Sequence, residues 1–345
     1  MLEMELQAVE MIDNALRLNE TLSKIDTLID SEDEYTRTIN TARWVINLIL
    51  TPILCILGVV GNILNIIVLR RCGFKDTNVL LLESLSLADL FLSLVHSILH
   101  AHFIVECFDL VLAALVGTFS FVYLFGAYQI TLCVVQCHLV SIAAERVIAV
   151  YFPFHVARIF SRSRVLIIIA CMYLFCFVLN FPGYFIFEPG LMHLPALNQT
   201  IYTIAPTKFF LDNYDTLGNF TNLGVGIFNA GVLPISIIIG SALVGIKLLI
   251  RKRQSFPKVK KSDANDLKGL RLLMAVCVVS ILFTISGLVM IHYYNVYRIM
   301  YGPFHELLLD ITNLICQFFS STNFVIYVTM SKKFYRTYRM LICRF

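Results

Sequence analysis

Seven long stretches of this sequence contain almost no charged residue, and this feature limits the possible folds more than any other. A helix needs about 20 mainly apolar residues to cross a hydrocarbon core about 30 Å thick. Inside a bilayer the backbone must pair its own polar groups, which leaves helices or closed barrels, and these stretches lack the alternation of barrel strands. We therefore predict an all-α protein, a seven-transmembrane helix bundle, with spans at Val45–Leu69, Ser84–Val105, Leu110–Ala144, Val165–Phe187, Thr216–Ile246, Leu272–Tyr297 and Ile311–Met330.

The composition excludes several other classes of protein. Of the 345 residues, 58% are hydrophobic and 14% are charged, whereas soluble domains have about 45–50% apolar and about 25% charged residues. The net charge of only +4 predicts no nucleic acid among the partners. The spans lack the residue clusters of enzymes, because Cys133, Cys137 and His138 lie on an otherwise apolar helix where we expect a packing role. We expect neither an enzyme nor a metal centre.

The basic residues predict the orientation in the membrane. Segments 70–76, 145–164, 247–271 and 332–344 hold 21 of the 27 Lys and Arg residues and four acidic residues, and they border the same side. The other side has six basic and sixteen acidic residues. Basic loops stay in the cytoplasm, so the N-terminus lies outside. We expect a multi-pass plasma-membrane protein with an extracellular acidic tail (1–43), a seven-helix domain (44–330) and an amphipathic cytoplasmic helix with a short tail (331–345). The basic loop 251–268 suits anionic membrane lipid.

Several short motifs occur in a characteristic order along the spans. Glu145-Arg146 ends span three, and Pro153-Phe154 follows it; Asn62 lies in span one, Asp89 in span two, and Asn323 and Tyr327 near the end of span seven. This set, in this order and on these sides, resembles the rhodopsin-like (class A) G-protein-coupled receptors over about residues 44–343. Within that class the loops look like those of divergent invertebrate neuropeptide or chemosensory receptors.

The resemblance implies roles for these residues. Ligand binding would release Arg146 from Glu145 and open a cytoplasmic crevice for a heterotrimeric G protein, with Pro153, Phe154 and Tyr327 taking part. A mid-membrane polar network of Asn62, Asp89, Ser320 and Asn323 could hold a sodium ion, although Val135 replaces the serine that usually helps. Cys343, beside the membrane, could be palmitoylated.

Simpler roles remain open for the same residues. Glu145 and Arg146 could form a solvated ion pair worth less than about 1 kcal/mol. Tyr327 could only pack against its neighbours. A carboxyl group at mid-membrane costs several kcal/mol unless it is partnered, so Asp89 belongs either to a functional site or to a buried structural network.

The sequence departs from the class at several positions. The cysteine that usually begins span three and bridges to the second outer loop is Phe121, and the chain from Glu188 to Thr221 contains no cysteine. Only Cys107 is expected near the outer surface, so we predict no outer disulfide. Tyr128 stands where amine receptors carry an aspartate, and Gln317 stands where opsins carry the retinal lysine. A monoamine ligand and a retinal cofactor are therefore both excluded by the resemblance.

The outer half of the bundle supplies polar residues for a ligand pocket. A single histidine in a span is more often a satisfied core group than a ligand contact, so these residues are candidates only: His96, His100, Tyr128, Gln129, Asn180, Tyr184, His292, Tyr293, Asp310 and Gln317.

The acidic outer face favours a cationic ligand, so our first prediction is a receptor for a neuropeptide. The alternative is a chemosensory receptor for a small water-soluble molecule. A transporter or channel is a second alternative, which the absence of internal repeats and of charged pore faces makes weaker.

Three Asn-x-Thr triplets generate a test of the orientation. Asn19, Asn198 and Asn219 all fall on the predicted outer side, so glycosidase treatment of receptor from animal cells should lower its apparent mass. An epitope at Met1 that antibodies reach only after permeabilisation would contradict the orientation.

Overall fold

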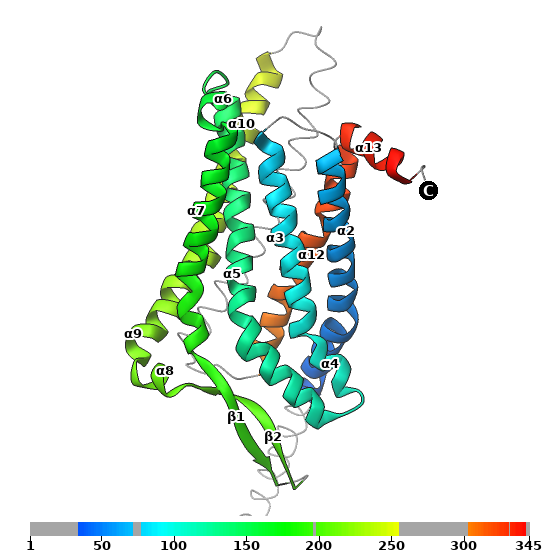
Figure 1. The fold of residues 1–345 in the computed structure, drawn as a ribbon, viewed down its shortest axis with the longest axis vertical. Helices are drawn as coiled ribbons and strands as arrows, with labels where there is room; N and C mark the ends of the chain where they lie inside the picture. The colour runs from blue at the N-terminus through cyan, green and yellow to red at the C-terminus, as the bar shows by residue number, and fades with distance from the viewer. Residues whose placement is uncertain (1–33, 72–76, 196–197, 255–302, 331, 343–345) are drawn as a thin grey trace, which may run out of the picture.

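A computed structural model describes residues 34–71, 77–195, 198–254, 303–330 and 332–342, and most of them lie in helices that run side by side in one bundle (Figure 1). Within these residues, five helices are long and apolar enough to cross a membrane: Glu34–Arg71, Val79–Glu106, Leu110–Tyr151, Arg162–Phe185 and Phe228–Lys247. A sixth long helix, α12 (Pro303–Met330), carries the predicted span seven. The predicted span Leu272–Tyr297 lies outside the described residues.

The first and third spans are longer than the sequence predicts. Helix α2 (Thr51–Arg71) continues a helix that starts at Glu34 and passes through a π-helical segment at Ile46–Leu50. Helix α5 (Leu110–Tyr151) follows the N-cap residue Asp109, whose carboxylate accepts hydrogen bonds from two backbone amides. The helix runs seven residues past the predicted end. This extension places Glu145 and Arg146 inside the helix.

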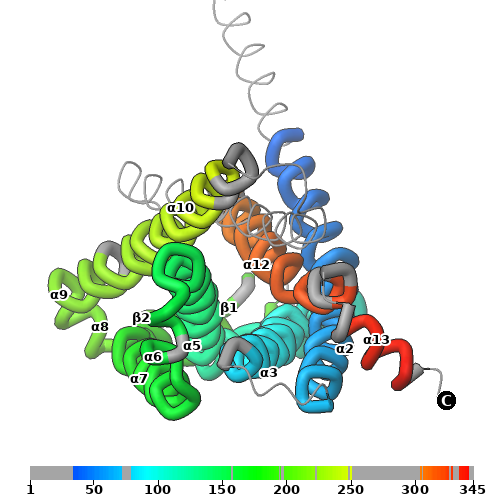
Figure 2. Tube along the Cα trace, turned by 90° about the horizontal axis from the view of Figure 1, so that it is seen from above, coloured from blue at the N-terminus to red at the C-terminus, as the bar shows by residue number. Residues whose placement is uncertain are grey.

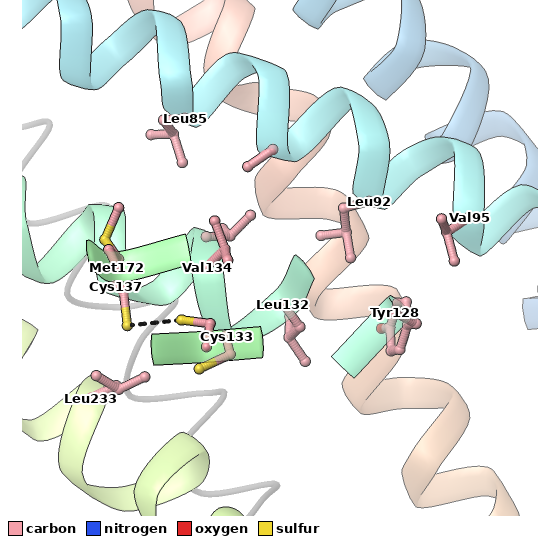
Figure 3. Packing of buried hydrophobic residues seen from close by; sticks show 13 residues of the cluster. Leu85, Leu92, Val95, Tyr128, Leu132, Cys133, Val134, Cys137, Met172 and Leu233 are labelled. Carbon is pink, nitrogen blue, oxygen red and sulfur yellow. Dashed lines mark hydrogen bonds between the residues drawn. The ribbon is translucent and has the colours of Figure 1, made fainter. Parts of the chain in front are cut away.

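Helix α5 holds the bundle together. It packs against α3 (Thr77–Leu99), α7 (Arg162–Asn180) and α10 (Leu233–Gln254), whereas α2 packs against α3 and α12 (Figure 2). The largest core cluster joins α3, α5, α7 and α10. Its buried side chains include Leu85, Leu92, Leu132, Val134, Met172 and Leu233 (Figure 3).

The second outer loop contains a β-hairpin that the sequence did not reveal. Strands β1 (Phe187–Leu194) and β2 (Gln199–Pro206) pair antiparallel, and Asn198 in the connecting turn has a φ of 46°, a value that Asn tolerates better than most residues. The hairpin lies against α5 through aromatic rings. Phe121 contacts Phe187 with ring centroids 5.3 Å apart, so an aromatic contact occupies the place of the class disulfide.

Short elements connect the long helices at both ends of the bundle. Helix α4 and the hairpin lie at one end, and α6 and α13 lie at the other (Figure 1). The remaining elements are α4 (Ala101–Glu106), α6 (Val156–Ile159), the 3-10 turn Phe181–Phe185, α8 (Lys208–Asp212), α9 (Tyr214–Asn219) and the π-helical segments Phe220–Val225 and Phe228–Val232 that lead into α10.

The predicted amphipathic helix after span seven is present as α13 (Lys332–Ile342), which turns away from the bundle (Figure 2). Phe334 is buried against Val68 and Leu69 of α2, while Arg336 and Arg339 are exposed. An apolar face on the bundle and a basic face toward the surroundings suit a helix lying at the cytoplasmic membrane surface.

Gly58 in α2 leaves room for side chains of α3 and α12, and this packing leads to a stability prediction. A Cβ added to Gly58 would lie 2.4 Å from Ser93 Oγ and 2.8 Å from Gln317 Nε2. Overpacking of this kind costs about 1–3 kcal/mol, so Gly58→Ala should lower the thermal unfolding midpoint of detergent-solubilised receptor. The control is Gly183→Ala, because nothing lies within 4 Å of its added Cβ. Equal midpoints for the two variants would show that α2 and α3 are not packed this closely.

Candidate functional site

The four residues of the predicted mid-membrane network lie together. Asn323 Nδ2 donates to Asp89 Oδ2 at 2.6 Å, and the Ser320 hydroxyl donates to the main-chain carbonyl of Asp89 at 3.3 Å. Asn62 Nδ2 donates to the carbonyl of Ser320 at 3.2 Å and so adds α2 to the group. These contacts join α2, α3 and α12 by hydrogen bonds in the middle of the bundle.

Ser93 and Gln317 extend this network outward. The Ser93 hydroxyl donates to the Asp89 carbonyl at 2.9 Å and accepts from Gln317 Nε2 at 2.9 Å. Gln317 Oε1 in turn lies 3.3 Å from His96 Nδ1. We call this series the polar chain; its members are Asn62, Asp89, Ser93, His96, Gln317, Ser320 and Asn323. Sequence reasoning missed Ser93, although its spacing of four from Asp89 puts both residues on one helix face.

The hydrogen bonds of Gln317 determine which ring nitrogen of His96 carries the proton. Gln317 Nε2 also donates to the main-chain carbonyl of Leu54 at 3.3 Å, and a carbonyl can only accept. The amide oxygen therefore faces His96, so Nδ1 of the neutral ring must be the donor. His96 Nε2 is left as an acceptor, and it has no partner among the described residues although the residue is only 1% exposed.

Two further histidines on the outer side share this arrangement. His100 Nδ1 lies 3.1 Å from the carbonyl of His96, and His102 Nδ1 lies 2.8 Å from the carbonyl of Leu99. Since a carbonyl only accepts, each neutral ring donates through Nδ1 and presents Nε2 as an acceptor. The outer end of α3 and the start of α4 therefore present several ring nitrogens that can accept hydrogen bonds.

An outer polar cluster forms where α3, α5 and α12 meet, and it consists of His96, His100, Tyr128, Asn313 and Gln317. The ring of His96 lies 4.2 Å from that of His100 and 5.3 Å from that of Tyr128, centroid to centroid. The Tyr128 hydroxyl donates to Asn313 Oδ1 at 2.9 Å. Asn313 did not emerge from the sequence, because a single asparagine in span seven carries no motif.

Asp310, predicted for the ligand pocket, forms an ion pair within the protein. Arg43 Nε donates to Asp310 Oδ2 at 2.8 Å, and the same guanidinium also pairs with Glu306. These pairs tie the first helix to the outer end of α12. They also neutralise part of the acidic outer face on which the prediction of a cationic ligand rested.

The other predicted pocket residues are more dispersed. Gln129 is half-buried on α5, and Asn180 donates a hydrogen bond to the main-chain carbonyl of Cys176. The ring of Tyr184 lies where a Cβ added to Gly126 would meet it. His292 and Tyr293 lie outside the described residues.

At the cytoplasmic end of α5, Glu145 and Arg146 form a loose ion pair. Arg146 Nε lies 3.8 Å from Glu145 Oε2, and the side chains are 49% and 4% exposed, respectively. Pro153 is exposed in the following turn, and Phe154 is 94% exposed there. Tyr327 belongs to α12, but its side chain lies outside the described part of the structure, as do Asn19 and Cys343.

Tyr151 links α5 to α10 at the same end, a contact that the sequence did not suggest. Its hydroxyl donates to the carbonyl of Leu243 at 3.1 Å, and Lys247 Nζ lies 5.3 Å from the centre of its ring. The ion pair Glu145–Arg146 and this contact lie within two helical turns of each other on α5.

The Asp89 carboxylate retains one free acceptor. Its Oδ1 atom is buried without a hydrogen-bond partner among the described residues, and the same holds for Ser86 Oγ one turn earlier on α3. A carboxylate oxygen and a hydroxyl are ligands that a hard cation accepts. The sodium site remains a prediction.

A family of known receptors matches most of the chain. The model of the family described as serpentine type 7TM GPCR chemoreceptor Srx matches residues 53–331. This range includes six of the seven predicted spans in full and the first span from residue 53 onward. No curated protein matches the chain. The match confirms the predicted seven-helix receptor and its multi-pass plasma-membrane location, and it is a match to receptors rather than to enzymes. This chain therefore belongs to the Srx family of serpentine seven-transmembrane G-protein-coupled receptors.

Proposed function

We propose that this receptor is a chemoreceptor for a small water-soluble molecule that donates a hydrogen bond to His96 Nε2. The observation that carries the proposal is this acceptor atom, which has no partner among the described residues. A buried polar atom without a partner costs about 1–3 kcal/mol, and a ligand hydroxyl or N–H group would recover that free energy. The family description, which names chemoreceptors, supports the same class of ligand.

A small uncharged or weakly charged ligand suits this site better than a cationic peptide. Arg43 already pairs with Asp310 and Glu306, so its positive charge offsets one of these two negative charges. The described groups at the outer polar cluster are neutral donors and acceptors. The neuropeptide prediction is therefore less favoured than its chemosensory alternative.

The polar chain offers a route from His96 toward the cytoplasm. His96 contacts Gln317, which binds Ser93 on α3 and Leu54 on α2 while it belongs to α12. A ligand that draws His96 away from Gln317 would change the hydrogen bonds of three helices at once. Ligand binding would act as a population shift between two arrangements of these helices.

On the cytoplasmic side we assign the output to Arg146 and its surroundings. Arg146 is half-exposed beside a nearly buried Glu145, and Phe154 offers an apolar ring to a partner. Loss of the Tyr151 contacts would let α10 move away from α5 and widen the space in which a heterotrimeric G protein docks. A transporter or channel would need a continuous polar path instead, and the family match favours a receptor.

The ligand class can be tested by screening receptor-expressing cells. Small uncharged molecules that bear hydroxyl or amide N–H groups should activate cyclic-nucleotide or calcium signals, whereas amidated peptides should not. For an active compound, His96→Phe keeps a ring but removes the acceptor, so its EC50 should rise about tenfold, the equivalent of about 1.4 kcal/mol. His193→Phe on the exposed hairpin is the control and should respond normally. Activation by peptides alone would refute the proposed ligand class.

The cytoplasmic switch predicts opposite effects for its two partners. Glu145→Gln should raise ligand-independent signalling several-fold, because an ion pair of this exposure contributes at most about 1 kcal/mol to the inactive state. Arg146→Ala should abolish G-protein activation while ligand binding persists. The matched control is Glu83→Gln, which removes a carboxylate from a different ion pair with Arg70. If all three variants signal like the parent at equal surface expression, Glu145–Arg146 is only a solvated pair.

A further inference from the structure

Three cysteine thiols meet inside the bundle, away from the polar chain. Cys133 and Cys137 lie one turn apart on α5, and Cys176 faces them from α7. Their three sulfur atoms all lie within 4.8 Å of one another, and Cys137 Sγ is 3.7 Å from Cys176 Sγ, a contact that Figure 3 marks with a dashed line. We call these three residues the thiol trio.

The trio is enclosed on the sides that the structure describes. Cys133 and Cys176 are 0% exposed and Cys137 is 9% exposed, and all three belong to the cluster that contains Leu132, Met172 and Leu233. His138, the next residue on α5, is directed elsewhere, because its ring nitrogens contact the carbonyl of Val134 and the hydroxyl of Ser84 at 2.8 Å each. The packing role expected for His138 is compatible with these contacts, but the three thiols form a separate group.

The spacing of the sulfur atoms suits a three-coordinate ion. With metal–sulfur bonds of about 2.3 Å, three sulfurs in a plane around one ion are about 4.0 Å apart. The separation between Cys137 and Cys176 is already close to this value. A displacement of the third sulfur atom by under about 1 Å, through a change in side-chain torsion, would bring it into place. Two of the ligands share one helix, which limits the rearrangement needed.

We propose that Cys133, Cys137 and Cys176 form a binding site for one soft monovalent cation of the Cu⁺ class. Thiol ligands select soft ions, whereas hard cations prefer oxygen. On binding, the coordinating thiols release their protons to the solvent and bind the ion as thiolates, because the thiolate is the form of cysteine that ligates metal.

Ligand number separates Cu⁺ from Zn²⁺ at this site. Zn²⁺ takes four ligands in structural sites. Among the described residues, the group of metal-ligating side chains contains three members, all cysteines. A bound Cu⁺ would connect α5, which carries Arg146, to α7 and would stabilise their contact.

The test uses full-length receptor purified in detergent under anaerobic, reducing conditions. Cu⁺ is supplied from a chromogenic chelator, and the receptor should withdraw one equivalent. X-ray absorption should then show sulfur neighbours at about 2.3 Å. Cu⁺ should also raise the thermal unfolding midpoint. Cys133→Ser and Cys176→Ser should each weaken Cu⁺ binding at least tenfold and remove the thermal shift.

The controls use cysteines outside the trio. Cys171→Ser changes an exposed thiol on α7, and Cys55→Ser changes a buried thiol on α2, so both variants should bind Cu⁺ like the parent. If a trio variant fails to fold, Cys137→Ala provides a further variant of the same site. Equal binding by the trio variants and the parent, or one-to-one binding of Zn²⁺ in preference to Cu⁺, would overturn the proposal.

Discussion

The side chain of Gln317 connects α2, α3 and α12 by hydrogen bonds inside the described bundle. A bilayer offers no water to a buried amide, so each of its hydrogen-bonding atoms must find a partner in the protein. Its amide group donates to Ser93 and to the carbonyl of Leu54 and faces His96 with its oxygen. Three helices are therefore fixed relative to one another by one residue. The tautomer of His96, and with it the chemistry offered to a ligand, follows from these bonds.

This arrangement requires close approach of the helices. Gly58 leaves room for Ser93 and Gln317, because any side chain on α2 at that position would occupy the same space. Small residues allow such contacts between membrane helices, where the hydrophobic effect does not drive association. Gly58 therefore leaves space for the contact between the helices, and the hydrogen bonds of the Gln317 amide fix the geometry of that contact.

Much of the fold could be predicted from the sequence, since charge-free runs and basic loops reflect the bilayer directly. Asn62, Asp89, Ser320 and Asn323 could be grouped in advance because the sequence resembles a receptor class in which polar residues at these places form one network. The ion pair of Arg43 with Asp310 could not, because it joins residues 267 positions apart. The hairpin was missed because its strands lie in a short loop without clear alternation. The thiol trio depends on how α5 and α7 are rotated, which no single helix encodes.

Aromatic packing attaches the hairpin to α5 at the place where the class has a disulfide. Phe121 and Phe187 form an aromatic pair, and such a pair contributes about 0.5–1.5 kcal/mol beyond the area that it buries. A disulfide at this point would typically contribute 2–4 kcal/mol and could not open without a reductant. The strength of this attachment therefore depends on the side chains that pack around Phe121 rather than on a covalent bond.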